Sequence, residues 1–333
     1  MSSSANRGFG TAIARFVAAL VLLAAMAAGP ALARDRPLAV VTTIAQIGEP
    51  LRAIAGDRAE VKSLLGEGVD PHLYRPTRSD VALLAGADVV FWSGLDLEAQ
   101  MKDTLGRLGA TRPVLAIAER LPPSRLLATP GAAHDPHVWM DPDLWRQALA
   151  VAVEALAGAD PEGGEGYRAR AQVYFARLGE LDAYIRTVIA SIPASARTVV
   201  TAHDAFNYFG ARYGLDVIGI QGISTESEAG LAAVEGLVTL LVERRIPAVF
   251  VETSVPERHV RALIEGAAAK GHTVIVGGAL FSDAMGAPGS WEGTYIGMLD
   301  HNATTLARAL GGTAPAGGLA GRLAAPVQAG GRR

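Results

Sequence analysis

The stretch that decides the fold is "EGGEGYRARAQVYFARLGELDAYIRTVIASI", residues 162–192. Its apolar side chains recur at spacings of three and four, which places them on one face of an α-helix. They are Tyr167, Ala171, Tyr174, Leu178, Leu181, Ile185 and Val188. Pro161 precedes the stretch and Pro193 follows it, as is typical of helix boundaries. A helix of about 28 residues is about 40 Å long, so we expect a stiff connection between two lobes; an ordinary surface helix is the alternative.

On either side of this helix, short apolar segments alternate with helical patterns. Residues 36–160 contain the strand-like segments "PLAVVTTIA", "AEVKSLLG", "DVVFWSG" and "RPVLAIA". Residues 194–311 repeat the rhythm with "ARTVVTAH", "LDVIGIQG", "IPAVFVETS" and "HTVIVGGAL". Such alternation favours parallel sheets covered by helices. We therefore predict an α/β fold of two lobes, each a mainly parallel sheet flanked by helices, joined by one long rigid helix.

The two ends of the chain have different compositions from the rest. Residues 1–33 contain Arg7 and Arg15, then an apolar run over 16–28 and the small-residue pattern Ala-Leu-Ala at 31–33. This order is typical of a secretory signal peptide. The alternative, a membrane anchor, requires about 20 apolar residues, more than the run provides. Residues 312–333 are rich in Gly, Ala and Pro, which predicts a disordered tail.

Composition excludes several classes of protein. The 333 residues correspond to about two domains. A formal net charge of −3 gives no basic surface of the kind that binds nucleic acid. The chain has no cysteine, which excludes disulfides, thiolate metal sites and a lipid-modified N-terminal cysteine. We expect a monomer in the periplasm that is not a lipoprotein.

Three of the seven histidines lie where α/β proteins bind ligands. His72 and His137 both occur in the tripeptide Asp-Pro-His, and proline fixes the backbone before each of them. His72 follows a predicted strand and His203 ends one, and ligands bind at the carboxyl ends of strands. His137 directly precedes a helix for which Asp141 is the predicted N-cap and Pro142 a first-turn residue. A lone loop histidine is more often a surface residue, but three in such positions favour a shared site.

Asp283 is the fourth candidate, because it follows the last predicted strand in "GGALFSDAMG". Three imidazoles and one carboxylate suit Zn²⁺ and also admit Mn²⁺. The alternative for Asp283 is a turn residue before a helix.

The other polar candidates have simpler interpretations. His134 is interpreted as a solvated loop residue, and the remaining histidines as surface or packing residues; these are His259, His272 and His301. Asp204 is a candidate N-cap. The segment "GISTESEAG", residues 222–230, is either a loop with a helix cap or a polar contact patch for a partner.

Several motifs together resemble one known family. They are "GVDPHLYRPTRSDVALLAGADVVFWSGLDLE", "DPHVWMDP", "TAHDAFNYFGARYGL", "GISTESEAG" and "LFSDAMGAPGSWEGTYIGMLDHN". The chain resembles the metal-binding components of bacterial zinc and manganese ABC importers, the TroA and ZnuA type, from about Leu38 to Leu310. The resemblance implies two α/β lobes joined by one long helix, with the metal ion held between them. On matching positions its ligands are His72, His137, His203 and Asp283.

Two departures from the family bear on the metal. Manganese-binding members often have glutamate where His203 stands. Many zinc-binding members carry a long histidine-rich loop, whereas residues 121–135 here contain only His134. The three imidazoles favour zinc, with manganese second.

The resulting interpretation is a non-enzymatic carrier. The protein captures a divalent ion, delivers it to a membrane permease, and releases it by local movement of a ligand loop, for example the one with Asp283. Neutral imidazoles bind metal, so affinity should fall as pH drops toward about 6.5. Two rival functions are a secreted metal-dependent hydrolase, with Glu252 as general base, and an adhesin-like interaction protein.

Overall fold

A computed structural model describes residues 36–129 and 134–323 of the chain. The expected signal peptide, residues 1–33, lies outside the described residues. From Pro37 onward the described chain forms one compact unit. Among the described residues, no helix combines the length and apolar composition needed to cross a membrane.

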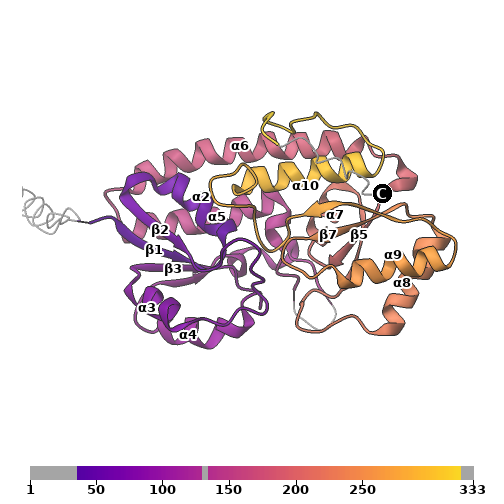
Figure 1. Cartoon of the computed structure of the whole chain (residues 1–333). Helices are drawn as coiled ribbons and strands as arrows, with labels where there is room; N and C mark the ends of the chain where they lie inside the picture. The colour runs from indigo at the N-terminus through magenta and orange to yellow at the C-terminus, as the bar shows by residue number, and fades with distance from the viewer. Residues whose placement is uncertain (1–35, 130–133, 324–333) are drawn as a thin grey trace, which may run out of the picture. The chain divides into compact units, whose positions relative to one another are not determined.

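The N-terminal lobe is built on one parallel sheet. Its four strands lie in the order β2-β1-β3-β4. They are β1 (Leu38–Thr42), β2 (Ala59–Ser63), β3 (Val89–Trp92) and β4 (Val114–Ala116). Helices α3 (Arg78–Gly86) and α4 (Lys102–Gly109) cover one face, and α2 (Ala45–Ala55) and α5 (Pro142–Ala159) the other (Figure 1).

Alternating strand residues supply the two cores of this lobe. Val41 and Val90 pack with Leu84 and Leu105 beneath α3 and α4. Val40 and Val89 point to the opposite face and join the main core. A period of two along buried strands produces this division.

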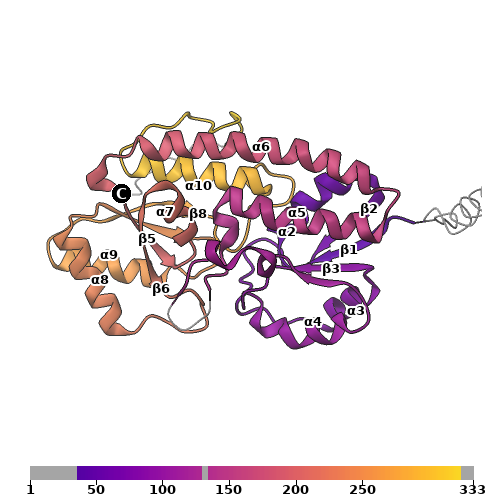
Figure 2. The same ribbon diagram turned by 180° about the vertical axis from the view of Figure 1, so that it is seen from behind.

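The C-terminal lobe has two pairs of parallel strands. β5 (Thr198–His203) pairs with β6 (Asp216–Gln221), and β7 (Ala248–Glu252) pairs with β8 (Ile275–Leu280). Its helices are α7 (Asn207–Tyr213), α8 (Leu231–Glu243), α9 (Arg258–Ala269) and α10 (Tyr295–Ala309). α8 and α9 enclose a second apolar core with β5 and β7. On the side of this lobe away from α8 and α9, α10 lies against the long helix α6 (Gly164–Ala190) (Figure 2).

One helix, α6 (Gly164–Ala190), connects the lobes. Its 27 residues correspond to about 40 Å, and it extends along both lobes in Figure 2. The buried face has the seven residues predicted from the spacing. These residues belong to one apolar core that contains Val89 of the first lobe and Leu299 of the second. The predicted fold class, two lobes joined by a long rigid helix, is confirmed.

The tail differs from its prediction. Residues 312–323 are not a disordered segment, because Ala314, Leu319 and Leu323 pack against the main core. The Leu319 N–H donates to Asp300 Oδ1 at 2.8 Å. The few apolar residues among the glycines are enough to anchor this part of the chain. Residues 324–333 lie outside the described residues.

Candidate metal centre

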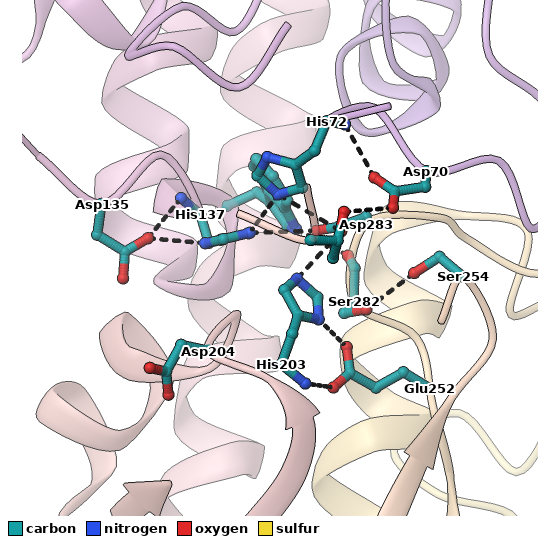
Figure 3. A network of polar contacts seen from close by, with 12 residues as sticks. Asp70, His72, Asp135, His137, His203, Asp204, Glu252, Ser254, Ser282 and Asp283 are labelled. Carbon is teal, nitrogen blue, oxygen red and sulfur yellow. Dashed lines mark hydrogen bonds and ion pairs between the residues drawn. The ribbon is translucent and has the colours of Figure 1, made fainter. Parts of the chain in front are cut away.

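Four side chains converge between the two lobes. His72 lies in the loop after β2, and His137 directly precedes the 3-10 turn Val138–Met140 that leads into α5. His203 is the last residue of β5, and Asp283 lies in the loop after β8. The strand ends therefore direct His72, His203 and Asp283 to the edge of the sheets where α/β proteins bind ligands, and the turn before α5 brings His137 to the same place. Figure 3 shows the four side chains pointing toward one another.

The four side chains form a compact buried group around the Asp283 carboxylate. Each offers one ligand atom that lies within 4.8 Å of the others. The Nε2 atom of His203 lies 3.1 Å from one Asp283 oxygen, and that of His137 lies 3.3 Å from the other. The His72 Nε2 atom is 3.7 Å from the carboxylate, and no member exposes more than 3% of its surface. Three imidazole nitrogens and one carboxylate oxygen are a donor set that suits Zn²⁺.

The Asp283 carboxylate has the imidazoles of the cluster as its neighbours. Both of its oxygens are buried and receive no hydrogen bond of good geometry from the described residues. Burying a polar oxygen without a partner costs free energy. A cation bound between this carboxylate and the imidazoles would bond to a carboxylate oxygen and compensate the buried charge, so the donor set fits a divalent ion.

The two Asp-Pro-His tripeptides adopt the same local structure. Asp70 Oδ1 accepts the His72 N–H at 2.8 Å, and Asp135 Oδ1 accepts the His137 N–H at 2.9 Å. Each aspartate therefore fixes the backbone of the histidine two residues later. We name residues 66–77 the His72 arm and residues 134–141 the His137 arm.

Carboxylates also hold two of the imidazole rings. His137 Nδ1 lies 2.8 Å from Asp135 Oδ1, and His203 Nδ1 lies 2.6 Å from Glu252 Oε2. The other Glu252 oxygen accepts the His203 N–H at 2.8 Å. A carboxylate on Nδ1 directs Nε2 toward a metal ion and raises its basicity. Glu252 thus binds the side of the ring that faces away from Asp283.

The pKa values of the histidines diverge in this setting. Burial, with the nearby His137 and His203, lowers the pKa of His72 to about 3, although Asp283 acts in the opposite direction. For His137, burial lowers the pKa, but Asp135 and Asp283 outweigh it and raise the value to about 9. Glu252 and Asp283 likewise outweigh burial and raise the pKa of His203 well above its usual value.

Asp283 shows the complementary shift. Burial raises its pKa, but His203 and His137 outweigh burial and hold the value well below its usual range. Without a bound ion, the group is therefore an ion-paired cluster with protons on His137 and His203.

The first lobe supports the loop that carries Asp283. The Gln46 side-chain amide donates to the Asp283 carbonyl at 2.8 Å. The Trp139 indole N–H donates to the Ser282 carbonyl at 3.0 Å. Since Gln46 and Trp139 are fully buried, these contacts fix the position of Asp283 from across the interface between the lobes.

Comparisons with known proteins identify the family of this chain. The model of the family described as "Zinc-uptake complex component A periplasmic" matches residues 40–309. The manganese-binding lipoprotein MntA of Bacillus subtilis is 46% identical over 277 residues, covering 83% of this chain and 90% of that protein. The zinc-binding protein TroA of Treponema pallidum is 44% identical over 280 residues, covering 84% and 91%. The chain belongs to the substrate-binding proteins of metal ABC transporters.

A solved structure supports the same assignment. The periplasmic zinc-binding protein TroA from Treponema pallidum superposes with a TM-score of 0.81 at 43% identity. The match covers 82% of this chain and 99% of that one. The resemblance on which the sequence interpretation relied is confirmed.

One expectation from the sequence is wrong. We expected a protein that is not a lipoprotein, because the chain has no cysteine. The relative MntA, which is 46% identical to this chain, is named a lipoprotein. The name of this relative conflicts with our expectation, which is therefore not kept.

The other histidines lie outside the cluster. His272 Nε2 lies 2.8 Å from the Ile246 carbonyl, and His301 Nε2 lies 2.9 Å from the Ala279 carbonyl. His259 lies on α9, and His134 is half-buried in the His137 arm. Within the described residues, the cluster around Asp283 is the only group of His, Asp and Glu side chains placed so that it could hold a metal ion.

Two predicted helix caps are not formed. Asp204 accepts the Gly219 N–H at 2.7 Å instead of capping α7, which begins three residues later. Residues 222–230, which we name the rim loop, place Gly230 at the N-cap of α8 without a side-chain cap. The Thr225 hydroxyl of this loop donates instead to Asp70 Oδ2 at 2.5 Å.

Sequence reasoning named the four converging residues but missed the groups that hold them. For Asp70 and Asp135 the signal was present, since each stands two residues before a histidine. Glu252 ends a strand beside His203, but it was interpreted as a hydrolytic base. Gln46 and Thr225 gave no signal, because their contacts join residues far apart in the sequence.

Proposed function

We propose that this protein binds one divalent transition-metal ion, zinc or manganese, between its lobes and delivers it to an ABC permease. In this proposal the ligands are Nε2 of the three histidines and the carboxylate of Asp283; the histidines are His72, His137 and His203. The observation that carries it is the buried Asp283 carboxylate, which faces three imidazoles and receives no hydrogen bond of good geometry from the described residues.

A binding protein fits this site better than a hydrolase. Four protein donors complete the tetrahedral coordination of a zinc ion, whereas a catalytic zinc ion has three protein ligands and binds water at the fourth position. The best candidate for a general base, Glu252, uses both oxygens on His203. We therefore infer that the protein is not an enzyme and that the ion is its cargo.

The donor set favours zinc over manganese. Imidazole nitrogen suits Zn²⁺, whereas oxygen donors suit Mn²⁺. The names of the relatives divide between the two metals, with MntA described as manganese-binding and TroA as zinc-binding. Zinc is the first candidate for this chain, and manganese the second.

The proposed partner is a membrane permease in the same transporter. The net charge of −3 provides no footprint for nucleic acid. The two lobes already share one core through α6, so the fold needs no second subunit to enclose the site. We propose a monomer that acts in the periplasm.

Competitive titration tests the proposed function. Metal-free protein is titrated with Zn²⁺ and Mn²⁺, and the metal content of protein from its native source is measured by elemental analysis. We expect one ion per chain. His137→Ala should weaken Zn²⁺ binding by orders of magnitude, whereas His134→Ala, in the same arm but outside the cluster, should change it little. Equal losses from both variants, or no metal binding by the wild type, would contradict the proposal.

A further inference from the structure

We propose that Thr225 is a positioning residue for metal release. Its hydroxyl, reaching across from the second lobe, holds the aspartate that fixes the His72 arm, and loss of this contact frees His72 before any other ligand. This inference rests on the proposed function, since it takes His72 as a ligand of the transported ion.

The contact links the rim loop to a ligand in two steps. Thr225 Oγ1 donates to Asp70 Oδ2 at 2.5 Å, and Asp70 Oδ1 accepts the His72 N–H at 2.8 Å. Hydrogen bonds to a charged acceptor are the stronger kind. The backbone position of His72 therefore depends on a hydroxyl that belongs to the opposite lobe.

Thr225 is an isolated anchor within an exposed loop. It is buried, with 8% of its surface exposed, while its neighbours Ser224 and Glu226 are exposed. The His72 arm is also exposed on both sides of the histidine, at residues 66–68 and at Leu73, which exposes 52% of its surface. The hydrogen bond from the Thr225 hydroxyl to Asp70 joins these two largely exposed segments directly.

The other three ligands are held more firmly. The rings of His137 and His203 are held by the buried carboxylates of Asp135 and Glu252. The loop with Asp283 is held by hydrogen bonds from Gln46 and Trp139 to its backbone carbonyls. We expected release through the Asp283 loop from the sequence, but these buried contacts favour the His72 arm as the part that moves.

A second hydrogen bond between the rim loop and the first lobe provides a matched control. Gln100 Nε2 of the first lobe donates to Glu226 Oε1 of the rim loop at 2.6 Å. This hydrogen bond joins the lobes one residue from Thr225, but neither of its partners bonds to a ligand arm. If release were controlled by the contact between the lobes in general, loss of either hydrogen bond would accelerate it. If release is controlled by the position of His72, only loss of the Thr225 hydrogen bond accelerates it.

The test is the rate at which the full-length protein releases Zn²⁺. Zinc-loaded wild type, Thr225→Val, Thr225→Ser and Gln100→Ala are mixed with excess of a coloured zinc chelator in a stopped-flow instrument. Loss of a hydrogen bond to a charged group should accelerate release by about tenfold or more in Thr225→Val. Thr225→Ser, which keeps the hydroxyl, and Gln100→Ala should release Zn²⁺ close to the wild-type rate.

A double-mutant cycle shows whether Thr225 acts through Asp70. In an Asp70→Ala background, Thr225→Val should cause no further acceleration, since the acceptor is already absent. Full additivity, a wild-type rate in Thr225→Val, or equal acceleration by Gln100→Ala would overturn the inference. If the valine variant does not fold, the release rate of Thr225→Ala is compared with those of the wild type and Gln100→Ala instead. Zinc binding by the wild type without these rate effects refutes only this inference, whereas its absence refutes the proposed function.

Discussion

The His72 arm and the His137 arm begin from the same three residues and end in different environments. In both, an aspartate accepts the N–H of the histidine two residues later. Both aspartates also accept a hydrogen bond from the second lobe, from Thr225 on Asp70 and from Asn207 on Asp135. Residues 135–141 are buried throughout, however, whereas the His72 arm is exposed on both sides of its histidine.

The difference lies in what the aspartate does beyond the turn. Asp135 contacts both the backbone and the ring of His137, whereas Asp70 contacts only the backbone of His72. The same motif thus gives one histidine whose ring is fixed in place and charged, and one whose ring is neutral and less restrained. A binding protein that must also release its ion needs both kinds of ligand.

The largest expected difference between the two arms is the release of a proton when the metal ion binds. With pKa values of about 9 for His137 and about 3 for His72, only His137 of these two carries the second ring proton of an imidazolium at pH 7 in the metal-free protein. His203 holds another. Metal binds the deprotonated ring, so affinity should rise with pH by about tenfold per unit for each proton displaced, up to about pH 9.

Calorimetry in buffers of different ionisation enthalpy measures this release directly. We expect about two protons per Zn²⁺ at pH 7, and ring-nitrogen NMR of the metal-free protein should assign them to His137 and His203. If no proton were released at pH 7, the histidines would be neutral in the metal-free protein. Affinity would then fall only as the pH drops toward about 6.5, as the sequence alone leads us to expect.

Substitution of the two aspartates should have unequal effects. Asp135→Asn removes the charge beside the His137 ring and should raise the Kd for Zn²⁺ by roughly 10–100-fold. Asp70→Asn keeps an oxygen that accepts the His72 N–H, so its effect should stay below about tenfold. Isothermal titration of both variants checks the difference, and an equal loss in the two would show that the arms are equivalent.

The smallest expected effect is on backbone motion. In the metal-free protein, the His72 N–H should exchange with deuterium at least about tenfold faster than the His137 N–H, because its surroundings are exposed. Hydrogen exchange followed by mass spectrometry resolves the two segments. Slower exchange in the His72 arm than in the His137 arm would contradict the contrast drawn here.

The predictable parts of the molecule are those with a local pattern. The spacing of apolar residues gave the buried face of α6, and the alternation of strands and helices gave the two lobes. His203 could be placed at the site because it ends a buried strand, and ligands bind at such ends. The Asp-Pro-His repeat drew attention to His72 and His137 for a local reason that the structure describes.

The parts that sequence reasoning missed depend on contacts between distant residues. Thr225 and Asp70 are 155 positions apart, and Gln46 and Asp283 are 237 apart. No spacing rule connects such pairs. Asp204 failed as a predicted cap because a strand N–H, that of Gly219, competed for its carboxylate. Glu252 was interpreted as a general base because a carboxylate at a strand end can serve either as a base or as the hydrogen-bond partner of a histidine, and the sequence does not distinguish these roles.

The most direct test is a crystal structure of the zinc-loaded protein with diffraction data collected at the zinc absorption edge. The account predicts one anomalous peak between the lobes, bonded to Nε2 of three histidines and to the Asp283 carboxylate, at about 2.0–2.2 Å. Those histidines are His72, His137 and His203. A peak elsewhere, or one bound by fewer than four of these side chains with water in the remaining position, would contradict it.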